Sequence, residues 1–129
     1  MESDILVVDD SAAIRKILQR VLRQTGMSIR TIHEAGDGQE ALEKLKTTTI
    51  DLVLTDINMP KMDGLQFLAA MKSSAECRHI PVVMITTEGG ETKVAEAVRL
   101  GAAGYVRKPF TADQIKEKLA GFLETALPL

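Results

Sequence analysis

Short apolar runs and longer helix-like patterns alternate five times along the chain. The apolar runs have the length of strands and lie at residues 5–8, 28–35, 52–56, 82–86 and 103–108. The first, third and fourth are the most apolar, which is typical of strands buried on both faces of a parallel sheet. The second and fifth are mixed, which favours positions at the two edges of that sheet.

Between these runs, apolar residues recur with the spacing of one face of an amphipathic helix. The first helix is expected to start after a cap at Asp10 or Ser11 and to end before Gly26. Three later helices open on a capping-box pattern, in which the cap is followed three residues later by Glu or Gln. These pairs are Asp37 with Glu40, Asp63 with Gln66, and Thr111 with Gln114.

The fourth helix has the thinnest apolar stripe. We expect it over about residues 91–100, with Val94, Ala97 and Val98 facing inward. In the fifth helix the apolar positions continue to Ala126, which predicts a helix that extends almost to the end of the sequence.

Five alternating strand–helix pairs predict an α/β fold: a (βα)5 doubly wound parallel sheet with helices on both faces and right-handed crossovers. Five pairs are too few for the eight-fold barrel. Placing the two mixed strands at the edges gives the strand order 2-1-3-4-5. The sequence has 129 residues without a linker or repeat, so we expect a single domain over residues 1–129.

Composition and charge narrow the class of protein. The net charge of −2 gives no general footprint for nucleic acid. No apolar run approaches the ~18 residues that a membrane span needs, and the acidic start of the sequence does not resemble a signal peptide. Cys77 is the single cysteine, so no internal disulfide forms, and we expect a buried, inert thiol in a cytoplasmic protein.

Four strands end in polar residues that this strand order places on one edge of the sheet. They are Asp9 and Asp10 after the first strand, Asp56 on the third, Thr86 on the fourth and Lys108 on the fifth. Ligands of open α/β sheets bind at that edge. Carboxylates from adjacent strands repel by roughly 1–4 kcal/mol per pair, and oxygen ligands without Cys or His favour Mg2+. The pattern predicts a phosphoryl site in which Asp56 is the nucleophile.

At these residues the chain resembles the receiver domains of two-component response regulators, in particular the stand-alone chemotaxis (CheY-like) type. The resemblance covers essentially the whole chain. Its motifs are VDDS at residues 8–11, DINMPKMDG at 56–64, TTE at 86–88, GAAGY at 101–105 and KPF at 108–110. The family has a flavodoxin-like fold with the order 2-1-3-4-5, so that order gives the resemblance no independent support.

The resemblance implies a role for each residue at the site. Asp56 is expected to accept a phosphoryl group from the phosphohistidine of a histidine kinase. Asp10, Asp56 and the backbone carbonyl of Asn58 are expected to bind Mg2+, with Asp9 acting chiefly through bound water. Lys108 is expected to contact the phosphoryl group.

Further roles follow from the same resemblance. The peptide bond before Pro109 is expected to be cis, which aims the lysine that precedes it. Thr86 is expected to move toward the phosphoryl group and Tyr105 to turn inward behind it. Asn58 and Glu88, two residues after the acceptor and after the threonine, are expected to tune the lifetime of the phosphoryl group.

We therefore expect a monomeric, phosphorylation-controlled binding module in chemotaxis, and not an enzyme. Its protein target is expected to bind the face of the fourth helix, fifth strand and fifth helix, with Gly89 and Gly90 as hinge. A phosphorelay carrier, which passes its phosphoryl group to another histidine protein, stays open as an alternative.

Two enzyme-like or ligand-binding classes fit the sequence less well. An aspartyl-nucleophile phosphatase of the haloacid dehalogenase type needs a second acid at the position of Asn58. A nucleotide-binding fold needs G-x-G-x-x-G or G-x-x-x-x-G-K-[ST], and neither motif occurs in the sequence.

Overall fold

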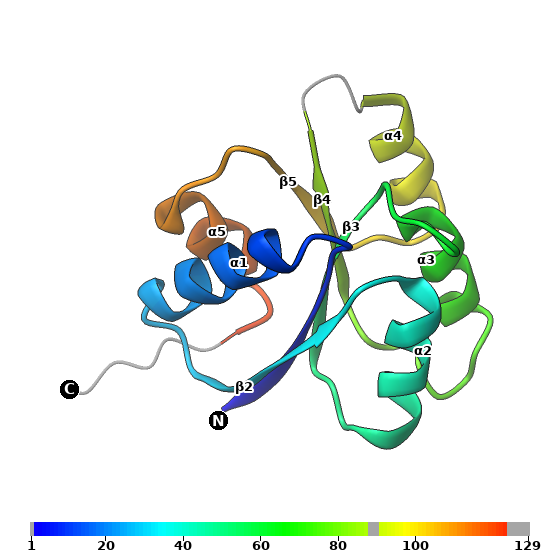
Figure 1. The fold of residues 1–129 in the computed structure, drawn as a ribbon, viewed down its shortest axis with the longest axis horizontal. Coiled ribbons are helices and arrows are strands. Elements are labelled where there is room, and N and C mark those ends of the chain that lie inside the picture. The colour runs from blue at the N-terminus through cyan, green and yellow to red at the C-terminus, as the bar shows by residue number, and fades with distance from the viewer. Residues whose placement is uncertain (1, 88–90, 124–129) are drawn as a thin grey trace.

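The computed structural model describes residues 2–87 and 91–123, which form a sheet between two layers of helices (Figure 1). The strands are parallel and lie in the order β2-β1-β3-β4-β5. In chain order they are β1 (Ser3–Val8), β2 (Ile29–Ala35), β3 (Leu52–Asp56), β4 (Val82–Thr86) and β5 (Gly104–Arg107). The predicted strand order is confirmed, with the two mixed strands at the edges.

Helices α1 and α5 cover one face of the sheet, and α2, α3 and α4 cover the other (Figure 1). Their bounds are α1 (Ala12–Gln24), α2 (Gly38–Thr47), α3 (Gly64–Lys72), α4 (Glu91–Arg99) and α5 (Ala112–Leu119). Each strand is followed by a helix, so the predicted (βα)5 arrangement is confirmed. Within the described residues, no helix has the length and apolar character needed to cross a bilayer.

The side chains of β1 point alternately into two separate hydrophobic cores. Leu6 and Val8 lie in the core on the side of α2, α3 and α4, whereas Ile5 and Val7 lie in the core under α1 and α5. All four side chains are fully buried. Burial on both faces explains why the sequence of this strand is continuously apolar.

The register of the central strands aligns their carboxyl ends. Val8 pairs with Thr55 across β1 and β3, and Asp56 pairs with Ile85 across β3 and β4. Asp9, the residue after β1, therefore lies level with Asp56. The alignment places the polar strand ends beside one another, as the strand order predicted.

Ser11 and not Asp10 is the cap of α1, because its hydroxyl accepts a hydrogen bond from the backbone N–H of Ile14. Gly26, just past the end of this helix, has φ of 73°. Glycine adopts this left-handed conformation at little cost, which explains its place there.

Two of the three predicted capping boxes are complete, those of α3 (Asp63 with Gln66) and α5 (Thr111 with Gln114). The third prediction is wrong in one half. Asp37 accepts from the backbone N–H of Glu40, but the Glu40 carboxylate accepts from the N–H of Gly36 instead of that of the cap. The side chain of Glu40 thus reaches one residue further back than in a capping box.

The last two helices differ from prediction in detail. In α4, Ala97 is buried, but Val98 is 55% exposed, because one residue further along a helix lies about 100° around its axis. α5 ends at Leu119, where Gly121 follows shortly and disfavours continuation of the helix. Ala126 lies outside the described residues.

Candidate functional site

The residues predicted to form a site come from four neighbouring strand ends. Asp9 and Asp10 follow β1, Asp56 and Thr86 are the last residues of β3 and β4, and Lys108 follows β5. Because these strands are parallel and aligned in register, their polar ends meet at one edge of the sheet.

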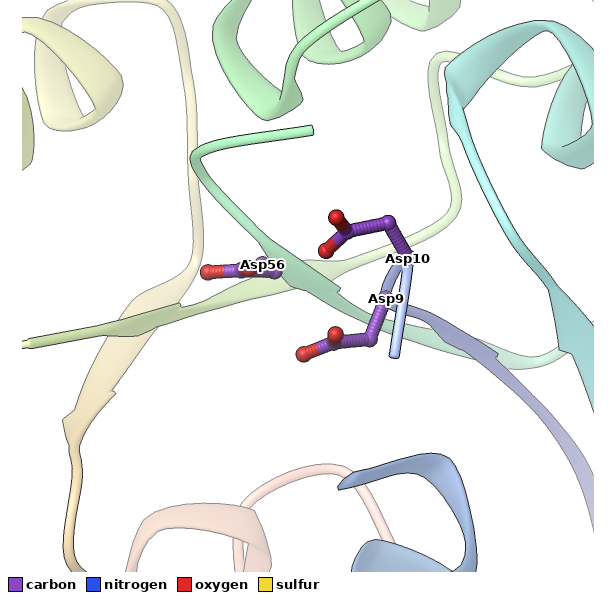
Figure 2. Close-up of side chains that lie close together, drawn as sticks. All are labelled: Asp9, Asp10 and Asp56. Atoms are coloured by element: carbon purple, nitrogen blue, oxygen red, sulfur yellow. The ribbon is translucent and has the colours of Figure 1, made fainter. Parts of the chain in front are cut away.

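Three carboxylates point into the same space at this edge (Figure 2). Each of Asp9, Asp10 and Asp56 offers an oxygen, and these oxygens lie within 4.8 Å of one another. Asp9 is 1% exposed and Asp56 is 8% exposed, whereas Asp10 faces solvent. Three acids so close, two of them buried, form a set of oxygen ligands that suits a hard divalent cation.

Lys108 places a positive charge against the two buried acids. Its Nζ lies 3.3 Å from Oδ2 of Asp9 and 3.8 Å from Oδ1 of Asp56. The backbone fixes the base of this side chain, since the N–H of Lys108 donates to the carbonyl of Thr86 at 2.7 Å. The peptide bond between Lys108 and Pro109 is cis, as expected.

Comparison with known proteins assigns this arrangement to a family. Residues 5–120 match the family described as the response regulator receiver domain. The chain is a response regulator receiver domain. It therefore belongs to the two-component signalling proteins, which are not enzymes in the usual sense, and the predicted family is confirmed.

Individual relatives support the same assignment. The receiver domain is 42% identical over 120 residues to chemotaxis protein CheY-3 of Vibrio cholerae. This match covers 93% of this chain and 91% of the relative. It is 40% identical to chemotaxis protein CheY of Pseudomonas aeruginosa, with coverage of 93% and 95%. Among solved structures, the chemotaxis response regulator CheY4 of Vibrio cholerae superimposes with a TM-score of 0.84 at 32% identity, covering 95% of this chain and all of that one.

The first residue of α3, Gly64, packs so closely against the end of β3 that no side chain fits there. The backbone N–H of Ile57 donates to Oδ1 of Asp56 at 2.9 Å, and the N–H of Gly64 donates to the carbonyl of Ile57 at 2.7 Å. A Cβ atom at Gly64 would lie 2.8 Å from the Cα of Ile57 and closer still to the carbonyl oxygen of Asp56. The absence of a side chain at Gly64 therefore lets α3 start directly against the strand end that bears Asp56.

The pKa of the Asp56 carboxyl is raised above its usual value, chiefly because burial disfavours the charged form. The positive charge of Lys108 opposes this shift, and the negative charges of Asp9 and Asp10 add to it. In the receiver domain without a bound cation, the ionised form of Asp56 is thus held against an electrostatic cost.

Thr86 lies at the site, and among the described residues its hydroxyl makes no hydrogen bond to Asp56. It is 4% exposed, and its hydroxyl donates to the carbonyl of Thr87 at 3.2 Å. Tyr105 is half-buried on β5, beside a pocket of about 250 Å3, and the ammonium of Lys118 lies 5.2 Å from the centre of its ring. The structure therefore places both residues predicted to switch on adjacent strands, with the tyrosine against α5.

Asn58 and Glu88 were the positions expected to tune the phosphoryl lifetime. Asn58 is exposed in the loop after β3, and its Oδ1 accepts a hydrogen bond from Nζ of Lys93 at 2.6 Å. Glu88 lies outside the described residues, as do Gly89 and Gly90, which were expected to form a hinge.

Two residues that touch the site were missed from the sequence. Lys93 is separated from Asn58 by 35 residues, and no sequence pattern links them. Arg15 donates from Nη1 to the backbone carbonyl of Asp9 at 2.7 Å. Its position in the first turn of the helix after the acids is a signal that could have identified it, because helical side chains lean toward the N-terminus.

Proposed function

We propose that this receiver domain accepts a phosphoryl group on Asp56 from the phosphohistidine of a histidine kinase. The observation that supports this most directly is the 3.8 Å approach of Lys108 to Asp56 within the cluster of acids. A carboxylate oxygen of Asp56 attacks phosphorus, the P–N bond to the histidine breaks, and its electrons remain on the imidazole nitrogen. The Lys108 ammonium then offsets charge on the phosphoryl oxygens.

The residues at the site fit a magnesium ion. In the proposal Asp10, Asp56 and the backbone carbonyl of Asn58 would hold the ion, and Asp9 would act chiefly through bound water. Bound Mg2+ would offset the negative charges of the acids and of the incoming phosphoryl group. Without it, two buried carboxylates share only Lys108 as a close positive partner among the described residues.

The proposed output is a protein contact on the face of α4, β5 and α5, with Thr86 and Tyr105 as the switch. The two helices that flank this face carry exposed apolar residues, Val98 on α4 and Phe122 just past α5, which supports a binding role. The curated relatives at 40% and 42% identity are chemotaxis proteins, which supports a role in chemotaxis. We further propose that residues 1–129 act as one monomeric domain in the cytoplasm.

The acceptor residue is tested with acetyl phosphate and Mg2+. The protein should gain one phosphoryl group that hydroxylamine removes, and Asp56→Asn should gain none. Asp113→Asn, at an exposed acid in the first turn of α5, is the matched control and should react as the wild type does. A modified peptide that maps to any residue other than Asp56 would contradict the proposal.

The metal site is tested by calorimetric titration with Mg2+. Wild-type protein should bind one ion, and Asp10→Ala should lose most of the affinity while Asp113→Asn keeps it. Equal titrations for wild type and Asp10→Ala would remove the acidic cluster from the mechanism.

A further inference from the structure

Arg15 connects the start of α1 to two other parts of the sheet edge. It is the fourth residue of this helix, and its side chain reaches back toward the helix N-terminus. Nη1 donates to the backbone carbonyl of Asp9 at 2.7 Å, and Nε lies 2.8 Å from Oε1 of Glu34 on β2. The side chain is only 19% exposed, and bonds of this kind to a charged donor are stronger than neutral ones.

These bonds complete a set that holds every polar group of Asp9. Its N–H donates to the carbonyl of Ala35, and its carboxylate accepts from the N–H of Ser11 at 2.9 Å and from Lys108 at 3.3 Å. Arg15 supplies the partner of the remaining group, the carbonyl. The peptide that joins Asp9 to the next residue is therefore fixed in orientation.

Asp10 stands in contrast to its neighbour. Its side chain is exposed, and within the described residues it has neither a hydrogen bond nor an ion pair. The direction in which its carboxylate points is thus set by the backbone from which it extends, and that backbone is the peptide whose carbonyl Arg15 holds.

We propose that Arg15 is a positioning residue for the divalent cation: by holding the Asp9 carbonyl, it orients Asp10 toward Asp56 before the ion binds. This inference rests on the proposed magnesium site. Groups that orient metal ligands without touching the metal commonly change its affinity by about 10- to 100-fold when they are removed.

The sign of the effect separates positioning from plain electrostatics. A guanidinium near three carboxylates repels a divalent cation, so removing its charge alone should tighten Mg2+ binding. Removing its hold on the Asp9 carbonyl should weaken binding, because the Asp10 carboxylate must then be ordered as the ion binds. The two causes act in opposite directions on one measured constant.

The test is the Mg2+ dissociation constant of Arg15→Met beside Lys16→Met. Both variants lose one positive charge from α1, but Lys16 is exposed and has no bond to Asp9 in the described structure. We expect Arg15→Met to raise the constant about tenfold, and Lys16→Met to leave it unchanged or lower it slightly. Arg15→Lys keeps the charge but loses the two-pronged donor, and should lie between.

Folding is measured separately, so that loss of structure is not mistaken for loss of positioning. Titrations are made well below the midpoint of thermal unfolding of each variant, and the dependence of acetyl phosphate reaction on Mg2+ is followed in parallel. Arg15→Met should need more Mg2+ for half-maximal rate but reach a wild-type rate at saturation.

Three results would overturn the positioning role of Arg15, and they differ in what they imply for the proposed function. An Arg15→Met constant equal to or lower than that of the wild type, in folded protein, would overturn the positioning role and leave the proposed function intact. If wild type and Asp10→Ala bind Mg2+ equally, the proposed metal site fails and the role of Arg15 fails with it. A tenfold loss in both Arg15→Met and Lys16→Met would show that the effect is not specific to the Asp9 carbonyl, and would also overturn it.

Discussion

The ammonium of Lys93, in the first turns of α4, lies 2.6 Å from the side-chain oxygen of Asn58, in the loop that follows Asp56. This bond joins a helix of the proposed output face directly to the proposed phosphorylation loop. It is independent of the route through β4 and Thr86. If that loop moves when a cation or phosphoryl group binds, this hydrogen bond must either break or move the start of α4 with the loop.

Lys93→Met should loosen the start of α4. An exposed pair of this kind stabilises by about 0.5–1 kcal/mol, so amide exchange in the first turns of α4 should speed up by about two- to fivefold. Hydrogen exchange followed by NMR measures this. Lys46→Met, at an exposed lysine of α2, is the control and should leave α4 unchanged. Unaltered exchange in α4 of Lys93→Met would mean that the bond restrains nothing.

The proposed switch predicts a linked movement of Thr86 and Tyr105. Beryllofluoride, which stands in for the phosphoryl group on Asp56, should draw the Thr86 hydroxyl from the carbonyl of Thr87 toward the site. The Tyr105 ring should then change rotamer, turn inward and leave the ammonium of Lys118 that now lies 5.2 Å from it. NMR of the apo and Mg2+–beryllofluoride forms measures these shifts.

In Thr86→Ala, beryllofluoride should still bind at Asp56, but the shifts in α4 and at Tyr105 should shrink. Shifts that stay confined to the loops around Asp56 in the wild type would leave Tyr105 a static residue of β5. The output face would then have to lie elsewhere on the receiver domain.

Asp56→Asn should stabilise the fold at neutral pH in the absence of Mg2+. The pKa of Asp56 is raised by burial, so the folded state binds the proton more tightly than the unfolded state does. The free energy of unfolding therefore falls as pH rises from the unfolded pKa of this carboxyl to its higher folded pKa. The neutral amide removes that penalty, so the variant should be more stable than the wild type at pH 7. Chemical denaturation in chelator-containing buffer should show the gain vanish on acidification. A gain that persists unchanged at low pH would have another cause.

Asp4, near the opposite end of the sheet, should show the reverse slope. Its pKa is lowered chiefly by the hydrogen bond from Arg30, which outweighs the opposing effect of burial, and the hydrogen bond with His33 adds to the lowering. Its contribution to stability is therefore complete above its unfolded pKa of about 3.9 and is lost as pH falls through the lower pKa of the folded state. Asp4→Asn should cost about 1 kcal/mol at pH 7 and nothing at the acid end. A cost independent of pH would point to packing instead of charge.

Much of this molecule follows from its sequence, because strand burial and helix periodicity are local patterns. The sheet order placed Asp9, Asp10, Asp56 and Lys108 together before any coordinates were known, since parallel strands share one carboxyl edge. The bonds of Arg15 and Lys93 did not follow, because each depends on how a helix is rotated against the sheet. The exposure of Val98 was mispredicted for the same reason: a thin apolar stripe does not fix the rotation of α4.

The alternation of β1 between two apolar cores has a consequence for how its alignment is chosen. A shift of this strand by one residue would exchange the cores that Leu6 and Ile5 enter, yet each core would still receive an aliphatic side chain. Hydrophobicity therefore selects the strand but discriminates poorly between its alignments. The hydrogen bonds of Asp9 with Ala35, Ser11 and Arg15 form in one register of the strand only, so they discriminate sharply between alignments. Asp9, a residue of the proposed signalling site, thus also fixes the register of β1 in the sheet.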